Sequence, residues 1–419
     1  METAVENFDT VVIGGGPGGA TTAALLARAG WSVAVLEQKD FPRRKVCGEY
    51  LSATNWPLFE ALGLAAAFGH NAGPDVRRVG LFAGRSSICV ELPQHRTGGV
   101  ARWGRALGRE RLDALLLEQA AVDGACVLQP WEAVELKPEG NHFRCLAVSQ
   151  SGDARRVLRA PIIVAAHGSW VHGKLPTQLA RRPKRGGELF GFKANFRHTA
   201  LPVDLMPLIS FRDGYGGLVY GDSGRVSLSC CLRRDRLASF DRQGKSAGEA
   251  VLEHLVAECP VLHDALAGAQ RDQAWLSAGP IRPGIRGGYR SGIFQVGNVA
   301  GEAHPVVAEG ISMAMQAAWL LAERLTASEA RTSCAARDAV GGDYSAAWLK
   351  AFAPRIRAAA AIARWAMHPA AVAVSLPVVR RFPGLLAWGA RCSGKTVTVC
   401  PGGRTKLWNE CGETSRGLT

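Results

Sequence analysis

The sequence predicts an α/β protein in which a Rossmann-like domain is interleaved with an antiparallel-sheet domain and followed by a helical C-terminal annex. Three observations predict this fold class. Residues 11–40 have the pattern of a strand, a glycine turn, a helix and a second strand. Short runs of alternating polarity, broken by Gly, Asp and Ser, recur near 76–102 and 188–279. The last hundred residues have apolar side chains at helical spacing.

The first strand and its turn carry a GxGxxG pattern. The β-branched run FDTVVIG leads into Gly14, Gly16 and Gly19. In such a turn the first glycine permits the bend, the second lets a pyrophosphate approach the backbone, and the third lets the helix pack on the strand. Pro17 suits the first helical turn, where its missing N–H costs nothing. The amides at this helix start are therefore expected to face a diphosphate, with Gly18 beside them.

The second strand, WSVAVLE, ends at Glu37, which Gln38 follows. A carboxylate at this position accepts hydrogen bonds from both ribose hydroxyls and repels a 2′-phosphate. Because strand, turn, helix, strand and acid occur in order within about thirty residues, the signal is strong. Glu37 and Gln38 are thus predicted to contact the adenosine of FAD or NAD.

Four further segments distinguish between these two dinucleotides. They read RRKVCGEYLS, RERLDALL, AAHGS and GNVAGEAHPVVAEGISMAMQ. Together with the glycine turn they resemble the FAD oxidoreductases of the p-hydroxybenzoate-hydroxylase fold, in the branch of geranylgeranyl reductases, aromatic monooxygenases and flavin halogenases. The resemblance covers roughly residues 9–325 and favours FAD over NAD as the bound cofactor.

The resemblance implies a set of FAD contacts. Arg109 corresponds to the family arginine on the diphosphate side, and the last segment corresponds to the motif that holds the ribityl chain and pyrimidine edge. The cofactor residues implied in this way are Arg44, Cys47, Gly48, Arg109, Asn298, Gly301, Gly310 and Ile311. Three positions depart from the family pattern: Asn298 and His167 each replace an aspartate, and Ala308 replaces a glycine.

The predicted domains are discontinuous along the chain. The FAD-binding domain is expected at 1–75, 103–187 and 280–330, the substrate-binding sheet at 76–102 and 188–279, and the helical region at 331–419. Pro369, Pro377 and Pro383 are expected to divide that last region into short helices.

Charge and cysteine content narrow the class of protein. The formal charge is +14, and residues 331–419 carry 13 Lys/Arg against 4 Asp/Glu. No nucleic-acid-binding module accompanies this excess, so it indicates a solvated basic face or, alternatively, a transient contact with a membrane surface or carrier protein. Eleven cysteines without a CxxC spacing favour reduced thiols, and no metal site is expected. The acidic N-terminal stretch has no apolar core, so we expect a cytoplasmic protein, with a membrane-peripheral position as the alternative.

Three residues are candidates for the chemistry. Cys47 is expected beside the flavin ring, although a buried cysteine is commonly a packing residue. His304 precedes Pro305 near the flavin edge, where a histidine can hold a proton or simply form a structural hydrogen bond. Tyr215 is expected to touch substrate, or else to be an ordinary turn aromatic. Glu302 and Glu309 are further candidates, although one of them can cap the following helix.

The sequence predicts an FAD-dependent monooxygenase that hydroxylates a lipophilic aromatic or polyketide-like molecule. The alternative is a flavin-dependent reductase of isoprenoid or enone double bonds, and a non-catalytic flavin-binding module is a third interpretation. Halogenation is not expected, because there is no tryptophan pair in GYGGLVYGDSG and no lysine between Val46 and Glu132. No second GxGxxG occurs, so NADPH or NADH is expected to bind only transiently as the reductant.

Overall fold

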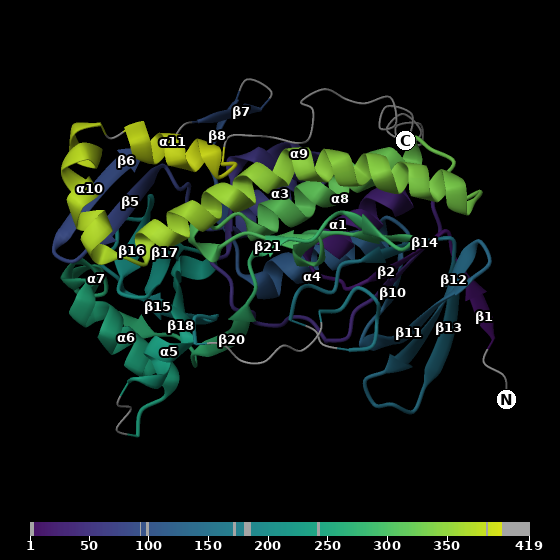
Figure 1. Ribbon diagram of the computed structural model, residues 1–419, viewed down its shortest axis with the longest axis horizontal. Coiled ribbons are helices and arrows are strands. Elements are labelled where there is room, and N and C mark those ends of the chain that lie inside the picture. The colour runs from purple at the N-terminus through teal and green to yellow at the C-terminus, as the bar shows by residue number, and fades with distance from the viewer. Residues whose placement is uncertain are drawn as a thin grey trace, which may run out of the picture.

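The computed structural model describes residues 4–92, 94–97, 100–170, 173–179, 186–240, 244–382 and 384–395 (Figure 1). Pro383 and the predicted end of the helical region, 396–419, lie outside the described residues.

A six-stranded sheet forms the centre of the half that the sequence predicts to bind a nucleotide. Its order is β10 (Cys126–Leu128), β3 (Val33–Leu36), β2 (Thr10–Ile13), β14 (Ile162–Ala165), β23 (Ile293–Gln295) and β22 (Tyr289–Arg290). All neighbours are parallel except the β22–β23 pair. Strands β2, β3, β14 and β23 are buried along their whole length, as expected for parallel strands covered on both faces.

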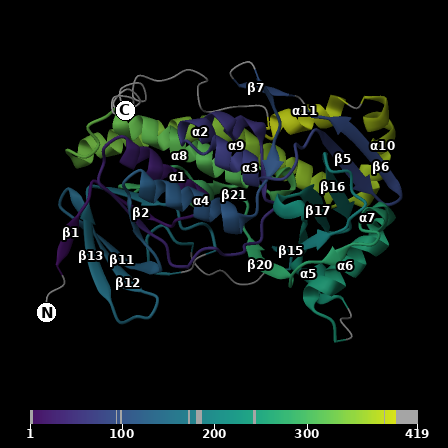
Figure 2. The same ribbon diagram turned by 180° about the vertical axis from the view of Figure 1, so that it is seen from behind.

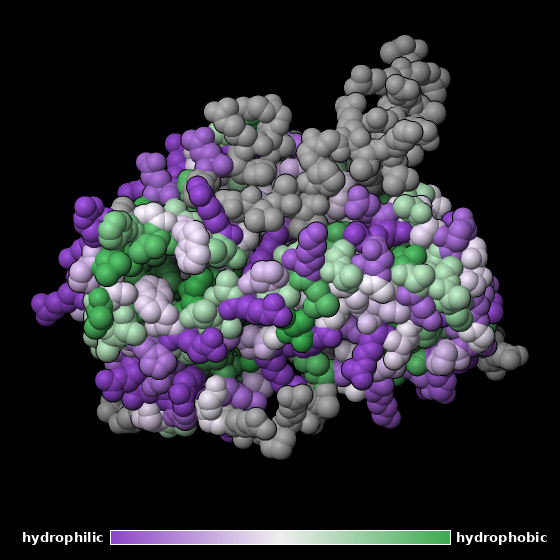
Figure 3. All heavy atoms as spheres, turned by 45° about the horizontal axis from the view of Figure 1, so that its top comes forward, coloured by the Kyte–Doolittle hydropathy of each residue, from purple (hydrophilic) through white to green (hydrophobic). Residues whose placement is uncertain are grey.

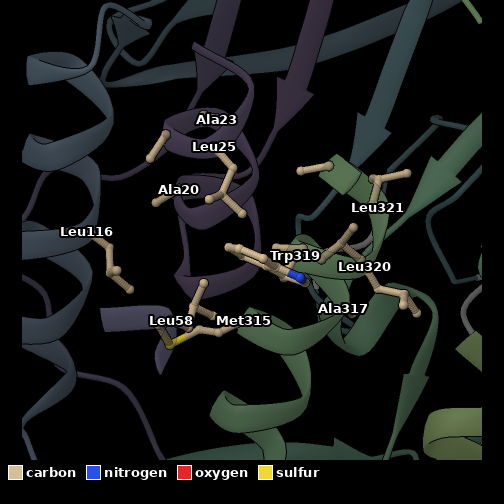
Figure 4. Packing of buried hydrophobic residues seen from close by; sticks show 14 of the residues in the cluster. Ala20, Ala23, Leu25, Leu58, Leu116, Met315, Ala317, Trp319, Leu320 and Leu321 are labelled. Carbon is tan, nitrogen blue, oxygen red and sulfur yellow. The ribbon is translucent and has the colours of Figure 1, made fainter. Parts of the chain in front are cut away.

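Side chains of this sheet alternate between two cores. Val12, Val35 and Val164 pack with the helices α1 (Pro17–Arg28), α4 (Arg109–Val122) and α8 (Gly310–Thr326). Figure 4 shows this packing, with Ala20 and Leu25 of α1 near Trp319 and Leu320 of α8. The alternate residues face a second core formed with the other sheet of this half. Because successive side chains of a strand point to opposite faces, one face of the sheet packs against helices and the other packs against strands.

That other sheet is an antiparallel meander with one added parallel strand. Its order is β1 (Val5–Asn7), β13 (Arg155–Ala160), β12 (His142–Ser149) and β11 (Trp131–Glu139). Residues 131–160 were assigned to the FAD-binding segment without any antiparallel sheet, so the meander is an element that sequence reasoning missed. Its buried positions in β12 alternate (iBiBiBii), which is the period-two signal for a half-buried strand.

The substrate-side half is an eight-stranded sheet. The order is β19 (Gln270–Arg271), β15 (Leu189–Arg197), β18 (Val226–Arg233), β17 (Gly214–Tyr220), β16 (Leu205–Phe211), β5 (Arg78–Ala83) and β6 (Ser86–Glu91), with β20 (Leu276–Ile281) also paired to β15. Helices α5 (Arg234–Ala238), α6 (Ala247–Glu258) and α7 (Pro260–Ala265) lie at this end of the molecule (Figure 2). Ser246 and Glu249 form a capping box that starts α6.

Short elements occupy the connections between the larger sheets and helices. They are the strand pairs β4 (Tyr50–Leu51) with β9 (Arg105–Ala106), β7 (His95–Thr97) with β8 (Val100–Arg102), and β21 (Gly284–Ile285) with β24 (Gly301–Glu302), together with helices α2 (Trp56–Ala61) and α3 (Ala65–Asn71) and the single turns η1 (Ala53–Asn55), η2 (Asp222–Gly224), η3 (Gly297–Val299) and η4 (Pro305–Val307).

Three helices end the described chain. The 33-residue α9 (Cys334–Ala366) extends along the top of both halves in Figure 1, followed by α10 (Pro369–Arg381) and α11 (Gly384–Cys392). The prediction that Pro377 ends a helix is wrong, because this proline lies inside α10. Pro377 and Ala373 are both exposed, so water can bond the carbonyl that the proline leaves without a donor.

The mixed α/β fold with C-terminal helices is confirmed; the domain boundaries stay a prediction. Among the described residues, no one helix has the length and apolarity to cross a membrane, and α9 with α10 meets that test only as a pair bent by 105°.

Candidate active site

A cavity of about 600 Å³ connects the two halves of the molecule. It is lined by the glycine turn after β2, the end of β3, the loop before β4, the residues preceding α8, strands β16–β18 and the helices α9–α11. This volume is in the range of sites that hold a cofactor or a drug-sized ligand. Most of the residues predicted from sequence lie on its wall.

The glycine turn has the shape of a phosphate cradle. Gly14 has φ +111°, and a Cβ added to it would lie 2.6 Å from the carbonyl oxygen of Ala166. A Cβ on Gly19 would overlap the carbonyl oxygen of Gly14, so this residue lets α1 pack on β2. At Gly16 the nearest atom to such a Cβ is Nη2 of Arg109 at 3.8 Å, an ordinary van der Waals contact. Gly14, Gly16, Pro17 and Gly18 line the cavity, where the free amides of α1 suit a diphosphate.

Glu37 is buried at the cavity wall. One carboxylate oxygen accepts a hydrogen bond from the Gly15 amide at 2.9 Å, and the other accepts from the Lys39 amide at 2.9 Å. These bonds hold the carboxylate at the end of β3, where it can accept from ribose hydroxyls. Gln38 lines the cavity beside it.

Cations surround the expected diphosphate position. Arg109, at the start of α4, is buried and forms a two-bond ion pair with Asp113 at 2.6 and 2.7 Å. Arg43 and Lys45 also line the cavity. Burial, followed by the charges of Arg109 and Arg43, lowers the pKa of Lys45 to about 8.

The position of Arg44 differs from the one expected from the sequence. It was predicted to contact FAD, but it is absent from the cavity wall and its guanidinium donates to the carbonyl of Ala274 at 3.0 Å. The loop between β3 and β4 has no regular period, so sequence spacing could not tell which of three adjacent cations faces inward. Arg43 and Lys45 are the residues that do.

The second helix start supplies the other end of the expected flavin site. Asn298, Gly310 and Ile311 line the cavity at the loop that leads into α8. Gly301 does not: a Cβ there would lie 2.5 Å from the ring of Trp348, so this glycine serves the packing of α9. Ala308, which stands where the family has glycine, is left-handed with φ 52°. The left-handed backbone that a glycine would favour is thus retained, and the alanine side chain makes this conformation strained.

Cys47 and Gly48 lie on the cavity wall in the loop before β4. The Glu49 amide donates to the Cys47 sulfur at 3.4 Å, and the Ser229 hydroxyl donates to the Cys47 carbonyl at 2.9 Å. The loop is therefore fixed to β18 of the substrate-side sheet. The Cys47 thiol also interacts with Arg109, which places it on the cofactor side of the cavity.

Glu49 forms an ion pair that sequence reasoning missed. Its carboxylate binds the ammonium of Lys193 on β15, and their exposed fractions are 4% and 1%. Glu49 also accepts from the Arg109 amide at 3.2 Å and has φ 61°. The pair joins residues 144 positions apart, so no local pattern could have shown it.

The structure brings His304 and Tyr215 together. The Tyr215 hydroxyl lies 3.2 Å from Nδ1 of His304, and both residues line the cavity. Burial, aided by Arg364, lowers the pKa of His304 to about 4. Burial also raises the pKa of Tyr215 well above its ordinary value, with Cys231 beside the phenol. Both groups are therefore uncharged at neutral pH.

The two glutamate candidates have structural partners. Glu302 accepts from the Ser169 hydroxyl at 2.8 Å and lines the cavity, and burial raises its pKa. Glu309 precedes α8 and accepts from the ammonium of Lys395 at 3.0 Å. Its side chain makes no capping bond to the helix, so the expected cap is not formed.

The far end of the cavity is apolar. The residues that close it come from the three C-terminal helices and include Ile362, Trp365, Val379, Leu385, Leu386 and Trp388. From the sequence, this region was interpreted as a packing annex or, alternatively, as a lid or a basic, apolar surface that collects a lipophilic substrate. Nothing local in it indicates which side chains turn toward the flavin half.

The comparisons with known proteins agree with this geometry. The family model described as an FAD binding domain matches residues 7–336. The chain belongs to that family. It is accordingly an FAD-dependent oxidoreductase, and the resemblance drawn from the sequence motifs is confirmed.

Three known proteins are similar to this member of the FAD-binding family. It is 25% identical to the menaquinone reductase of Mycolicibacterium smegmatis over 93% of this chain and 92% of that protein. It is 23% identical to the digeranylgeranylglycerophospholipid reductase of Methanocaldococcus jannaschii over 75% of this chain and 76% of that protein. The myxobacterial chondrochloren halogenase superposes with a TM-score of 0.73 at 20% identity, over 98% of this chain and 97% of that one, which shows a shared fold.

Proposed function

We propose that this protein reduces a carbon–carbon double bond of a lipophilic isoprenoid substrate. The observation that carries the proposal is an apolar cavity which joins the expected flavin edge to a pair of uncharged proton carriers, His304 and Tyr215. Two of the proteins similar to it are named as reductases of isoprenoid lipids, one of them along nearly its full length. This is the alternative drawn from the sequence; hydroxylation, the first prediction, has less support.

The addition of two hydrogens across a double bond needs a hydride and a proton. Reduced FAD, when bound, supplies the hydride, and the chain must supply the proton and exclude water. When His304 carries its proton on Nδ1, it donates to the phenol oxygen of Tyr215. The Tyr215 O–H is then free to deliver its proton to the substrate, which leaves a phenolate beside the His304 N–H, and Trp365 adds an apolar side chain to the cavity wall.

The residues present fit FAD. The open Gly16 cradle and the free amides of α1 suit the diphosphate, and Glu37 suits a ribose without 2′-phosphate. Asn298 and the start of α8 would lie against the flavin end. We further propose that NADPH or NADH reduces this FAD from a transient position, and that the enzyme works in the cytoplasm.

An oxygen-free assay tests the reaction type. The FAD-loaded protein, reduced with dithionite, is mixed with menaquinone, and both flavin absorbance and product mass are followed. We expect flavin reoxidation and, after the quinone ring has been reoxidised in air so that quinol does not contribute, a product whose isoprenoid side chain is heavier by two hydrogens. A product that forms only with oxygen, and carries ¹⁸O from labelled gas, would establish hydroxylation instead. If no product forms under either condition, the protein is a flavin-binding module for this substrate.

Tyr215→Phe is the variant that tests the proton donor. It removes the hydroxyl and keeps the ring, so FAD content and substrate affinity should hold while turnover falls by about 100-fold. A change in FAD content as large as the change in turnover would show a structural role.

A further inference from the structure

We infer that the outer face of α10 and α11 docks on a membrane surface rich in anionic phospholipid. This docking face is defined by five exposed apolar residues: Val374, Val378, Phe382, Leu385 and Trp388, with exposed fractions of 80%, 51%, 56%, 44% and 63%. In Figure 3, hydrophobic residues gather around a hollow in the part of the surface where α10 and α11 lie. Large exposed apolar patches of this kind mark interaction sites.

The docking face is continuous with the cavity. Leu385 and Trp388 are exposed on the surface and also line the cavity. The cavity therefore reaches the molecular surface at these two side chains. On the other side of α10, Val379 is buried and lines the same cavity. A lipid that leaves a bilayer at this face would reach apolar side chains without crossing water.

The charge around the docking face fits an anionic surface. Between residues 344 and 409 the sequence contains no aspartate or glutamate. Arg380, Arg381 and Arg391 lie on the exposed sides of α10 and α11. Apolar side chains flanked by arginine, with no acid among them, are the composition of a segment that lies in the interface of a membrane.

The same charge distribution disfavours a second copy as the occupant. In a two-fold dimer this face would meet itself, so its arginines would approach like charges with no carboxylate from either helix to offset them. The phosphate groups of an anionic bilayer would instead offset the positive charge of each arginine.

A buried ion pair connects the docking helices to the flavin loop. Lys395, just after α11, donates to the carboxylate of Glu309 at 3.0 Å and to the carbonyl of Val307 at 2.6 Å. The exposed fractions of the two charged side chains are 8% and 0%. This anchor holds α11 in a fixed position relative to the loop before α8, so a docked protein would keep its cavity opening toward the lipid.

Vesicle cosedimentation tests the inference on the full-length, FAD-loaded protein. The vesicles consist of phosphatidylcholine, with or without phosphatidylglycerol. We expect binding to the mixed vesicles that weakens as salt is raised. Val374→Glu should reduce this binding by about tenfold or more. Its matched control is Val122→Glu, which changes a valine that is 79% exposed at the end of α4 and should leave binding unchanged.

The arginines are tested by Arg380→Gln with Arg381→Gln, which should weaken binding to the mixed vesicles by roughly 25-fold, since each cation near an anionic surface contributes about fivefold. The control is Arg155→Gln, an exposed arginine of β13. Light scattering is measured on the same protein variants without vesicles. Absence of binding to mixed vesicles, equal effects of the two valine variants, or a dimer that Val374→Glu dissociates would each overturn the inference.

The biological purpose of docking rests on the proposed function, but the binding assay needs no turnover, so the two can fail separately. The Val374→Glu variant should still reduce the side-chain double bond of a short-chain, water-soluble menaquinone analogue at the wild-type rate if that function holds. Vesicle binding without any reductase activity would support the docking face and contradict only the proposed reaction.

Discussion

The two ends of the cavity are built in opposite ways. The nucleotide end consists largely of backbone amides and buried polar groups, and its glycine turn and ribose-side carboxylate come from one continuous stretch between Gly14 and Glu37. The substrate end consists of apolar and aromatic side chains from β16–β18 and from α9–α11, which are far apart in the sequence. Local sequence therefore determines how the cofactor is held, whereas tertiary packing determines what can lie against it.

The largest effect is expected where the two ends meet, at the buried pair of Glu49 and Lys193. Lys193→Met leaves the Glu49 carboxylate buried without its cation, so it should lower the free energy of unfolding by about 3 kcal/mol or more. The double variant Glu49→Gln with Lys193→Met removes both charges and should recover much of this loss. Denaturant unfolding measures all three proteins.

The control for this pair is Lys137→Met, at an exposed position of β11. Lys137 pairs with Glu135 at 2.8 Å, but its side chain is 66% exposed, so its loss should cost less than about 1 kcal/mol. Equal costs for the buried and the exposed pair would show that Glu49 and Lys193 do not connect the two halves energetically.

The pH dependence of stability compares a histidine from each end. Burial lowers the pKa of His167, beside the glycine turn, and of His304, beside Tyr215, to about 4 from an ordinary 6.5. As the pH falls from 6.5 toward 4, the unfolded chain takes up protons that the folded chain does not, so stability decreases. At pH 5 each histidine should account for about 1 kcal/mol, allowing for partial exposure.

Melting temperatures at pH 7 and pH 5 check this for wild type, His167→Asn and His304→Asn. Each variant should lose less stability on acidification than the wild type does. If only one of them does, the other histidine is hydrated in solution; if neither does, the account of their burial is wrong.

The smallest effect is expected at Ala308, the left-handed residue in the flavin loop. Ala308→Gly relieves strain of about 1–2 kcal/mol but gives the unfolded chain more freedom, so it should stabilise the protein by about 0.5 kcal/mol. Ala361→Gly, at an exposed position inside α9, should instead destabilise by about 1 kcal/mol. The same sign for both variants in thermal unfolding would contradict the strain at Ala308.

The sequence was most informative where the site is local. The glycine turn and Glu37 could be predicted because strand, turn, helix and strand follow one another with fixed spacing, and each residue has one backbone role. The prediction failed by one position at Arg44, since an irregular loop has no period that tells which of its side chains face inward.

Contacts between distant segments could not be predicted. Tyr215 and His304 were both selected as candidates, but their pairing across 89 positions depends on how β17 packs against the loop before α8. Likewise, a proline ends a helix when the carbonyl four residues earlier cannot reach water. In α10 both Pro377 and Ala373 are exposed, so the helix continues. The residues that meet at the substrate end could therefore be identified only from the structure.

The FAD content of purified Gly16→Val protein tests the central claim most directly. Gly16 has φ −70° and ψ −176°, which valine tolerates, and the nearest atom to an added Cβ is 3.8 Å away, so the protein without cofactor should fold and melt like the wild type. The branched side chain would, however, fill the space of the diphosphate. We predict a wild-type protein that holds FAD and a colourless, equally stable Gly16→Val variant. A variant that binds FAD as tightly as the wild type would contradict the placement of the nucleotide in this cavity.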